Sequence, residues 1–535
     1  MVGRGGAVAS RSHKAEHGVP VNEGTVLSPR CASSLILVFG LVALGGCVAM
    51  PDWRATPAAG SPQARCLALI GDMDEAVAAH DVGDAGAARI KTFPYLRIDR
   101  FLASFRHELG APGAFEDWVG HLRWLDDKAR LIEAVNLPAD ARTSLAARHG
   151  VADPEGFGIA ASRCGDLLLQ VEVLEGAGDA REALVRAAVA PSHYNQWQRA
   201  AGLYPIANLG AAIGYARWKD EHTKSFALSF EPATPSEDVT VYVPGARADT
   251  GEAARIVRSA PRTALGLPKF SERDVAHLSA AFAPVFEIET ESNDDRLGRP
   301  VWRREDGKLL PDVDVMRPVA TTRLVYTRFE GRVLPQLVYT VWFPARPLQG
   351  RFDLLGGRID GFIWRVTLDE TGEPLIYDAI HACGCYHMFF PVAPLARVSV
   401  PEDRDMREAP LSPKSAPRLA PGERMHLRLA ATSHYLLNLG AAKRAPAGAV
   451  HYGLQSAHVP PTFGGRSLPL PEGGRRSFFG PTGIVPYTDR LERFTLWPLG
   501  IESPGAMRQW GTHATAFVGE RHFDDPFLFD RAFAR

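Results

Sequence analysis

Four residues that can bind a metal or carry out redox chemistry fall at every second position of one stretch: His381, Cys383, Cys385 and His387. The stretch runs from Tyr377 to Pro391 and reads Y-D-A-I-H-A-C-G-C-Y-H-M-F-F-P. Alternate side chains of an extended strand point to the same face. Imidazole nitrogens and thiolates are ligands of zinc and copper. The pattern therefore predicts a zinc or copper site formed by these four residues.

The spacing limits how such a site can form. Side chains two positions apart on a strand stand about 7 Å apart, so two adjacent members of the set can share one ion. His381 and His387 would stand about 20 Å apart on a straight strand, which is too far for one ion. Gly384 can adopt backbone conformations that bend the strand and gather the ligands.

Two other roles of Cys383 and Cys385 stay open. They can form a redox-active disulfide if Gly384 bends the chain, because an extended backbone holds the two sulfurs too far apart. They can also pack as small apolar side chains beneath the aromatic residues that follow them. Asp378 can orient a histidine of the stretch through a hydrogen bond, as carboxylates do beside many metal sites.

The sequence contains none of the common catalytic motifs. It has no G-x-S-x-G, no Walker loop, no H-E-x-x-H and no G-x-G-x-x-G after a strand. Lys and Arg number 60 and Asp and Glu 61, so there is no excess of positive charge for binding nucleic acid. Whether the protein is an enzyme stays open, and no nucleic-acid partner is expected.

The N-terminal residues indicate export and lipid attachment. Leu35 to Gly46 is an apolar run of 12 residues after Arg30. It is shorter than the roughly 20 residues of a membrane-spanning helix and fits the core of a signal peptide. The sequence Leu44 to Cys47, L-G-G-C, resembles the lipobox of bacterial lipoproteins. The resemblance implies a signal peptide over residues 1–46 and a lipid on Cys47, the first residue after cleavage.

This resemblance also implies a location. A lipid on Cys47 would anchor the protein to a membrane of the bacterial cell envelope, facing the periplasm. Val48, rather than Asp, follows the cysteine, which among bacterial lipoproteins is more typical of the outer membrane than of the inner one.

Disulfides form in that compartment, so the remaining cysteines can pair. Without Cys31 and Cys47, the cysteines that remain are Cys66, Cys164, Cys383 and Cys385. We predict a disulfide between Cys66 and Cys164, with two free buried thiols as the alternative. Because this bridge closes a long loop, the chain-entropy model gives it a contribution of about 4 kcal/mol to stability.

Hydrophobic spacing changes along the rest of the chain. Residues 47–64 are rich in Pro, Ala and Gly and are expected to form a lipidated tether. Residues 65–220 are predicted to form a helical domain. In Phe115 to Ala134, for example, apolar residues recur at spacings of three, four and seven. A helix is also expected over Leu96 to Glu108.

Residues 225–535 are predicted to form a β-rich domain. Hairpin turns are expected at Glu330-Gly331 and at Asp369 to Gly372, and the second hairpin leads into the His/Cys stretch. Ser225 to Phe230 is expected to be a strand, and Glu287 to Pro311 a loop. The predicted fold class is therefore α+β, with a helical N-terminal domain followed by a mainly antiparallel, sandwich-like C-terminal domain.

Taken together, these patterns predict a lipid-anchored protein of the bacterial cell envelope with a metal-binding or redox site on a strand. The competing hypothesis is a non-enzymatic envelope scaffold that binds a partner protein, in which the cysteines only stabilise the fold.

Overall fold

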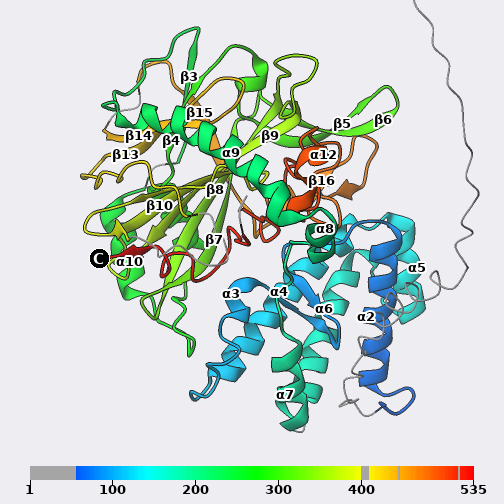
Figure 1. Cartoon of the computed structure of the whole chain (residues 1–535). Coiled ribbons are helices and arrows are strands. Elements are labelled where there is room, and N and C mark those ends of the chain that lie inside the picture. The colour runs from blue at the N-terminus through cyan, green and yellow to red at the C-terminus, as the bar shows by residue number, and fades with distance from the viewer. Residues whose placement is uncertain (1–55, 177, 247, 399–408, 444–445, 516–518) are drawn as a thin grey trace, which may run out of the picture. The chain divides into compact units, whose positions relative to one another are not determined.

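The predicted α+β class is confirmed by the order of the elements, because helices come first in the chain and the main sheet follows (Figure 1). The computed structural model describes residues 56–535 except 177, 247, 399–408, 444–445 and 516–518. This described part belongs to one compact unit. The signal peptide and Cys47 lie outside it, so lipidation stays a prediction.

Helices form most of the N-terminal part. They are α2 (Pro62–Ala79), α3 (Arg100–Ala103), α4 (Ala114–Asn136), α5 (Ala139–His149), α6 (Phe157–Leu168), α7 (Gly178–Ala187), α8 (Gln196–Ala201) and α9 (Tyr204–His222). The apolar stripe predicted for α4 is buried, with Trp118 and Leu122 at its centre. A disulfide joins Cys66 of α2 to Cys164 of α6, as predicted.

The helix expected over Leu96 to Glu108 is wrong in its first half. Strand β2 (Phe93–Ile98) occupies that position and pairs with β1 (Ala88–Ile90). The chain turns into α3 at Asp99, whose side chain caps the helix by accepting a backbone hydrogen bond at 2.8 Å. Aspartate is a favoured residue at this cap position, so the helix begins here and not upstream.

Among the described residues, the main sheet has ten strands in the order β11-β10-β9-β8-β7-β15-β3-β4-β13-β14. Their bounds are β3 (Val239–Pro244), β4 (Val285–Glu289), β7 (Val319–Phe329), β8 (Arg332–Arg346), β9 (Gly357–Leu368), β10 (Pro374–His381), β11 (Met388–Pro391), β13 (Arg424–Leu429), β14 (Leu436–Ala442) and β15 (Val450–Ser456). The pairs β7–β15, β15–β3 and β4–β13 are parallel and the other neighbours are antiparallel. The strands thus form one continuous, mainly antiparallel sheet in place of two stacked layers.

Both predicted hairpins are confirmed. Strands β7 and β8 are joined at Glu330 and Gly331, whose φ angles are 51° and 73°. Two positive φ angles are typical of the tight turns that suit the twist of a hairpin. Strands β9 and β10 are joined through Asp369 to Gly372, and β10 leads directly into the His/Cys stretch.

Two local expectations are wrong. Glu287 to Pro311 is expected to be a loop, but much of this range forms strands. In it, β5 (Arg299–Glu305) pairs with β6 (Lys308–Asp314) in a separate hairpin. The strand expected over Ser225 to Phe230 begins instead as a 3-10 helix that continues α9. The Ser225 hydroxyl donates to the His222 carbonyl at 2.8 Å, a local bond that favours a turn over a strand.

Ion pairs join the helical part to the segments around the sheet. Buried Arg466 donates from Nε and Nη2 to the buried Asp84 carboxylate at 2.6 and 2.7 Å. Arg328 of β7 binds Glu108, which follows α3, at 2.6 Å. Bidentate Arg–carboxylate pairs of this kind fix geometry as well as adding energy. The second pair links the segment after α3 to β7, which contributes to the candidate site.

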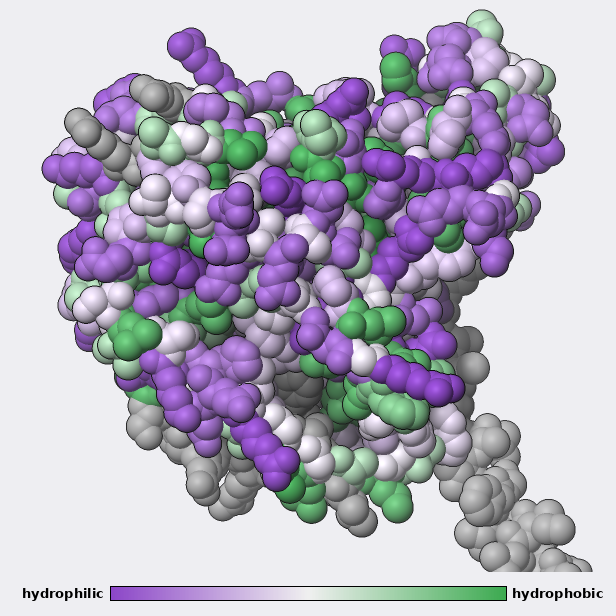
Figure 2. All heavy atoms as spheres, turned by 90° about the horizontal axis from the view of Figure 1, so that it is seen from above, coloured by the Kyte–Doolittle hydropathy of each residue, from purple (hydrophilic) through white to green (hydrophobic). Residues whose placement is uncertain are grey.

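The face of the molecule in Figure 2 is mostly hydrophilic, with apolar side chains in small separate groups. None of the helices that the structure describes is both long enough and apolar enough to span a membrane.

Candidate functional site

The predicted His/Cys stretch forms a turn at the edge of the sheet. It connects β10 to the edge strand β11. The His381 N–H donates to the Cys385 carbonyl at 3.0 Å, and Gly384 adopts a φ of 94°. The chain is therefore bent here, whereas four side chains on the same face of a strand would require a straight strand.

His387 is held by a carboxylate beneath it. Its Nε2 lies 2.7 Å from Oδ2 of Asp378, which Arg365 also binds at 2.8 and 2.7 Å. Asp378 therefore orients a histidine of the stretch, as predicted. Burial lowers the pKa of His387 to about 4 against the opposing effect of Asp378, so the ring is neutral at pH 7.

His381 faces a different carboxylate. Its Nδ1 lies 3.9 Å from Oδ1 of Asp360. The other oxygen of this carboxylate, Oδ2, lies closer to a second histidine, at 2.8 Å from Nδ1 of His434. Burial lowers the pKa of His381 to about 4. His381 and His387 thus have separate partners.

Within the described ranges, no three His, Cys, Asp or Glu side chains are arranged to hold a metal ion. The zinc or copper site stays a prediction.

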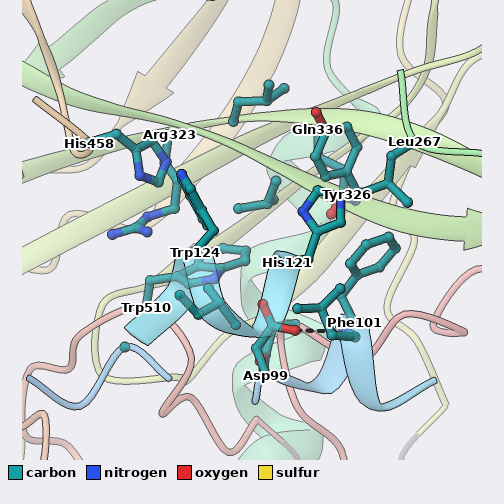
Figure 3. A pocket seen from close by; sticks show the side chains of 16 residues that line it. Asp99, Phe101, His121, Trp124, Leu267, Arg323, Tyr326, Gln336, His458 and Trp510 are labelled. Atoms are coloured by element: carbon teal, nitrogen blue, oxygen red, sulfur yellow. Dashed lines mark hydrogen bonds between the residues drawn. The ribbon is translucent and has the colours of Figure 1, made fainter. Parts of the chain in front are cut away.

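A cavity of about 110 Å³ lies between the helical part and the strands β7 and β8 (Figure 3). Segments far apart in the sequence contribute to its walls: α3 and α4, β7 and β8, the residues after β15, and the C-terminal segment. The side chains that carry its chemistry are Asp99, His121, Trp124, Arg323, His458 and Trp510.

Arg323 of β7 supplies a positive charge to this cavity (Figure 3). Its guanidinium makes no hydrogen bond or ion pair with any residue that the structure describes. Burial and the nearby charge of Arg466 lower the pKa of Arg323 to about 9. The group is still charged at neutral pH, and it has no counter-ion in contact with it.

Two histidines of the cavity walls are uncharged: His458, which lies near this cation, and His121. Burial lowers the pKa of His458 well below its usual value, and the charge of Arg323 lowers it further. Burial also lowers the pKa of His121. A neutral imidazole offers one hydrogen-bond donor and one acceptor. The cavity therefore combines one cation with two neutral polar rings.

Asp99, which caps α3, lines the cavity as a weak acid. Burial raises the pKa of Asp99 to about 6, and the nearby charge of Asp524 contributes in the same direction. Asp524 is bound by Arg100 at 3.0 Å. Near pH 6, Asp99 therefore changes between a neutral acid that can donate a hydrogen bond and an anion.

Aromatic rings form the apolar part of the walls. Trp124 is 43% exposed and its ring centre lies 5.7 Å from that of His458. Trp510, Phe101 and Tyr326 also line the cavity. Flat rings beside a guanidinium suit a ligand that joins a planar or apolar body to an anionic group.

The sequence patterns alone do not indicate this site. Arg323 precedes the predicted turn at Glu330-Gly331, and this charged residue within T-T-R-L-V-Y-T interrupts an otherwise uncharged pattern. Trp124 falls outside the buried stripe of α4. Each signal is weak alone, because a single surface arginine or tryptophan needs no special explanation.

A scan against protein-family models finds no match to this chain, and searches of curated proteins and of solved structures find none either.

Proposed function

We propose that this protein binds a small anionic ligand, with a carboxylate or phosphate group, in the cavity beside Arg323. The observation that carries the proposal is the guanidinium of half-buried Arg323, which lines the cavity without a hydrogen-bond or ion-pair partner among the described residues. A partly buried charge without a partner costs free energy that an anionic ligand would offset. Arginine suits this role because its planar fork can donate two parallel hydrogen bonds to a carboxylate or phosphate.

The size of the cavity narrows the ligand class. Pockets for drug-sized ligands have volumes of roughly 300–1,000 Å³, and this cavity measures about 110 Å³. The ligand is therefore small, with its anionic group at Arg323 and an apolar or planar body against Trp124 and Trp510. The neutral rings of His121 and His458 provide hydrogen bonds without competing for the anion.

Calorimetric titration of the full-length protein in detergent tests this proposal. Benzoate and phenyl phosphate are suitable probes because each joins a flat ring to an anion, and benzyl alcohol is their neutral counterpart. We expect the anions to bind and the alcohol not to bind. Arg323→Gln is expected to weaken binding by about tenfold or more, and Arg323→Lys by less, because lysine keeps the charge but loses the fork.

Arg332→Gln is the matched control, because Arg332 lies on β8 but is exposed and bound to Glu370. It should leave affinity unchanged. Equal affinity of the parent and Arg323→Gln for both anions would contradict the proposal, as would failure of both anions to bind the parent.

We also propose that the protein is anchored to the bacterial envelope by a lipid on Cys47. The support is the order of apolar run, small residues and cysteine at Leu35 to Cys47. Growth of an expressing bacterium with a labelled fatty acid should label the parent and leave Cys47→Ala unlabelled. Label in the variant, or none in the parent, would refute lipidation at this position.

A further inference from the structure

The turn between β10 and β11 brings the thiols of Cys383 and Cys385 together. Its backbone is closed by the Gly384 N–H, which donates to the His381 carbonyl at 2.8 Å. The side chains of Cys383 and Cys385 both line the same small cavity. Both cysteines are free thiols in this structure. The bend removes the obstacle that an extended strand presents to a bond between them.

Neighbouring segments hold this turn in place. The Arg508 backbone N–H donates to the Ala382 carbonyl at 2.8 Å, and its Nε donates to the Cys383 carbonyl at 3.2 Å. A Cβ atom on Gly384 would lie 2.5 Å from the Ala514 carbonyl oxygen. The backbone around the two sulfurs is therefore confined to this conformation, and the sulfurs stay close to each other.

We propose that Cys383 and Cys385 form a reversible dithiol–disulfide pair that exchanges with a low-molecular-mass disulfide. In the first step, the Cys385 thiolate attacks one sulfur of the disulfide RSSR, forming a mixed disulfide and releasing one RS⁻. In the second, Cys383 loses its proton and attacks the Cys385 sulfur, releasing the second RS⁻. The protein loses two electrons and two protons, and RSSR gains them to become two RSH.

The order of the two steps follows from exposure. Cys383 is only 8% exposed, whereas Cys385 is partly exposed and can be reached by a small disulfide.

Glutathione disulfide is the probe for the test. The full-length protein, first treated with a mild thiol reductant, is incubated in buffers of graded glutathione to glutathione disulfide ratio. Free thiols are then alkylated and the peptides are mapped by mass spectrometry. We expect the peptide with Cys383 and Cys385 to lose both alkylation sites through an internal disulfide, and to regain both when reduced glutathione is restored. Cys66 and Cys164 are the internal reference for a structural disulfide.

Two single variants separate the steps. Cys383→Ser should stop at a stable glutathione adduct on Cys385, because the second thiol is missing. Cys385→Ser should form no adduct under the same conditions, because Cys383 is buried. The graded glutathione titration uses the parent protein alone, so it is independent of whether either variant folds.

Two results would overturn the proposal. The first is a parent protein whose two thiols stay fully alkylated at the highest glutathione disulfide ratio. The second is a disulfide from Cys383 or Cys385 to another cysteine. This site is separate from the Arg323 cavity, so neither test depends on the other.

Discussion

Asp99 is a single carboxyl group that folding makes less acidic. Its pKa is about 6 in the folded protein and about 3.9 for aspartate in an unfolded chain. The folded state therefore binds this proton more tightly, so stability falls as the pH rises from about 4 to about 6 and stays lowered above that range. Asp99→Asn removes the charge but keeps a capping side chain. We expect it to raise the free energy of unfolding by about 1–2 kcal/mol at pH 7.5 and to give little gain at pH 4.

Urea unfolding of parent and variant at the two pH values measures this difference. Asp249→Asn is the control, because Asp249 caps α10 (Thr250–Ser259) in the same way but is exposed. A gain for Asp99→Asn that is equal at both pH values would show that the charge is not its cause.

The Asp378 carboxylate is essential to a fully buried ion pair of the sheet. Arg365 and Asp378 are 1% and 0% exposed, and His387 also binds this carboxylate. Asp378→Asn would leave the Arg365 charge buried without its counter-charge, which costs about 3 kcal/mol or more in such pairs. Urea unfolding should show this loss. In contrast, Glu182→Gln, which breaks an exposed pair with Arg186, should cost less than about 1 kcal/mol.

Residues of one short segment could be predicted to act together, and residues from distant segments could not. The interaction of Asp378 with His387 was within reach of the sequence, since the two residues lie nine positions apart on one hairpin. That Arg323 has no partner could not be predicted from the sequence, because it depends on which side chains α3, α4 and the C-terminal segment bring to β7. A charge without a partner is a property of the folded surroundings.

At the scale of elements, the disulfide between α2 and α6 is expected to stabilise the folded protein. It joins Cys66 to Cys164, which are separated by 98 positions in the sequence. Replacing both with Ser should lower the free energy of unfolding by about 4 kcal/mol, because the unfolded chain regains the freedom of that loop. Thermal unfolding measures the loss, and a reductant should produce the same loss in the parent protein. A variant as stable as the parent would show that packing alone holds the two helices together.

Elements defined by local chemistry are the most predictable. The helix α11 (Glu272–Ala281) begins with the reciprocal capping of Ser271 and Asp274, which is visible in the sequence. The turn at Glu330-Gly331 is likewise a local signal. The sheet order was not predictable, because β15 inserts in parallel between β7 and β3 from more than 100 residues away. Alternation shows that a strand exists but does not identify its neighbour.

At the scale of the whole molecule, we expect the helical part and the sheet to unfold together. Residues 65–220 and 225–535 are predicted from the sequence to form two domains, but buried contacts join the two parts. Asp84 is held by Arg466, and the Asn136 side chain donates to the Arg466 carbonyl at 2.9 Å. Produced alone, the helical part would lose the Arg466 counter-charge of Asp84 and the hydrogen bond of Asn136.

The whole protein should therefore show one urea transition, with tryptophan fluorescence and far-ultraviolet circular dichroism changing together, because coincident signals are the mark of a single cooperative step. Residues 56–224 alone should show no cooperative transition. Asp84→Asn in the whole chain should move the single transition to lower urea without splitting it, since Arg466 loses its counter-charge. Two separate transitions in the parent, or a cooperative transition in the isolated helical part, would show instead that the two parts are independent domains, and that the Arg323 cavity lies at an interface between them.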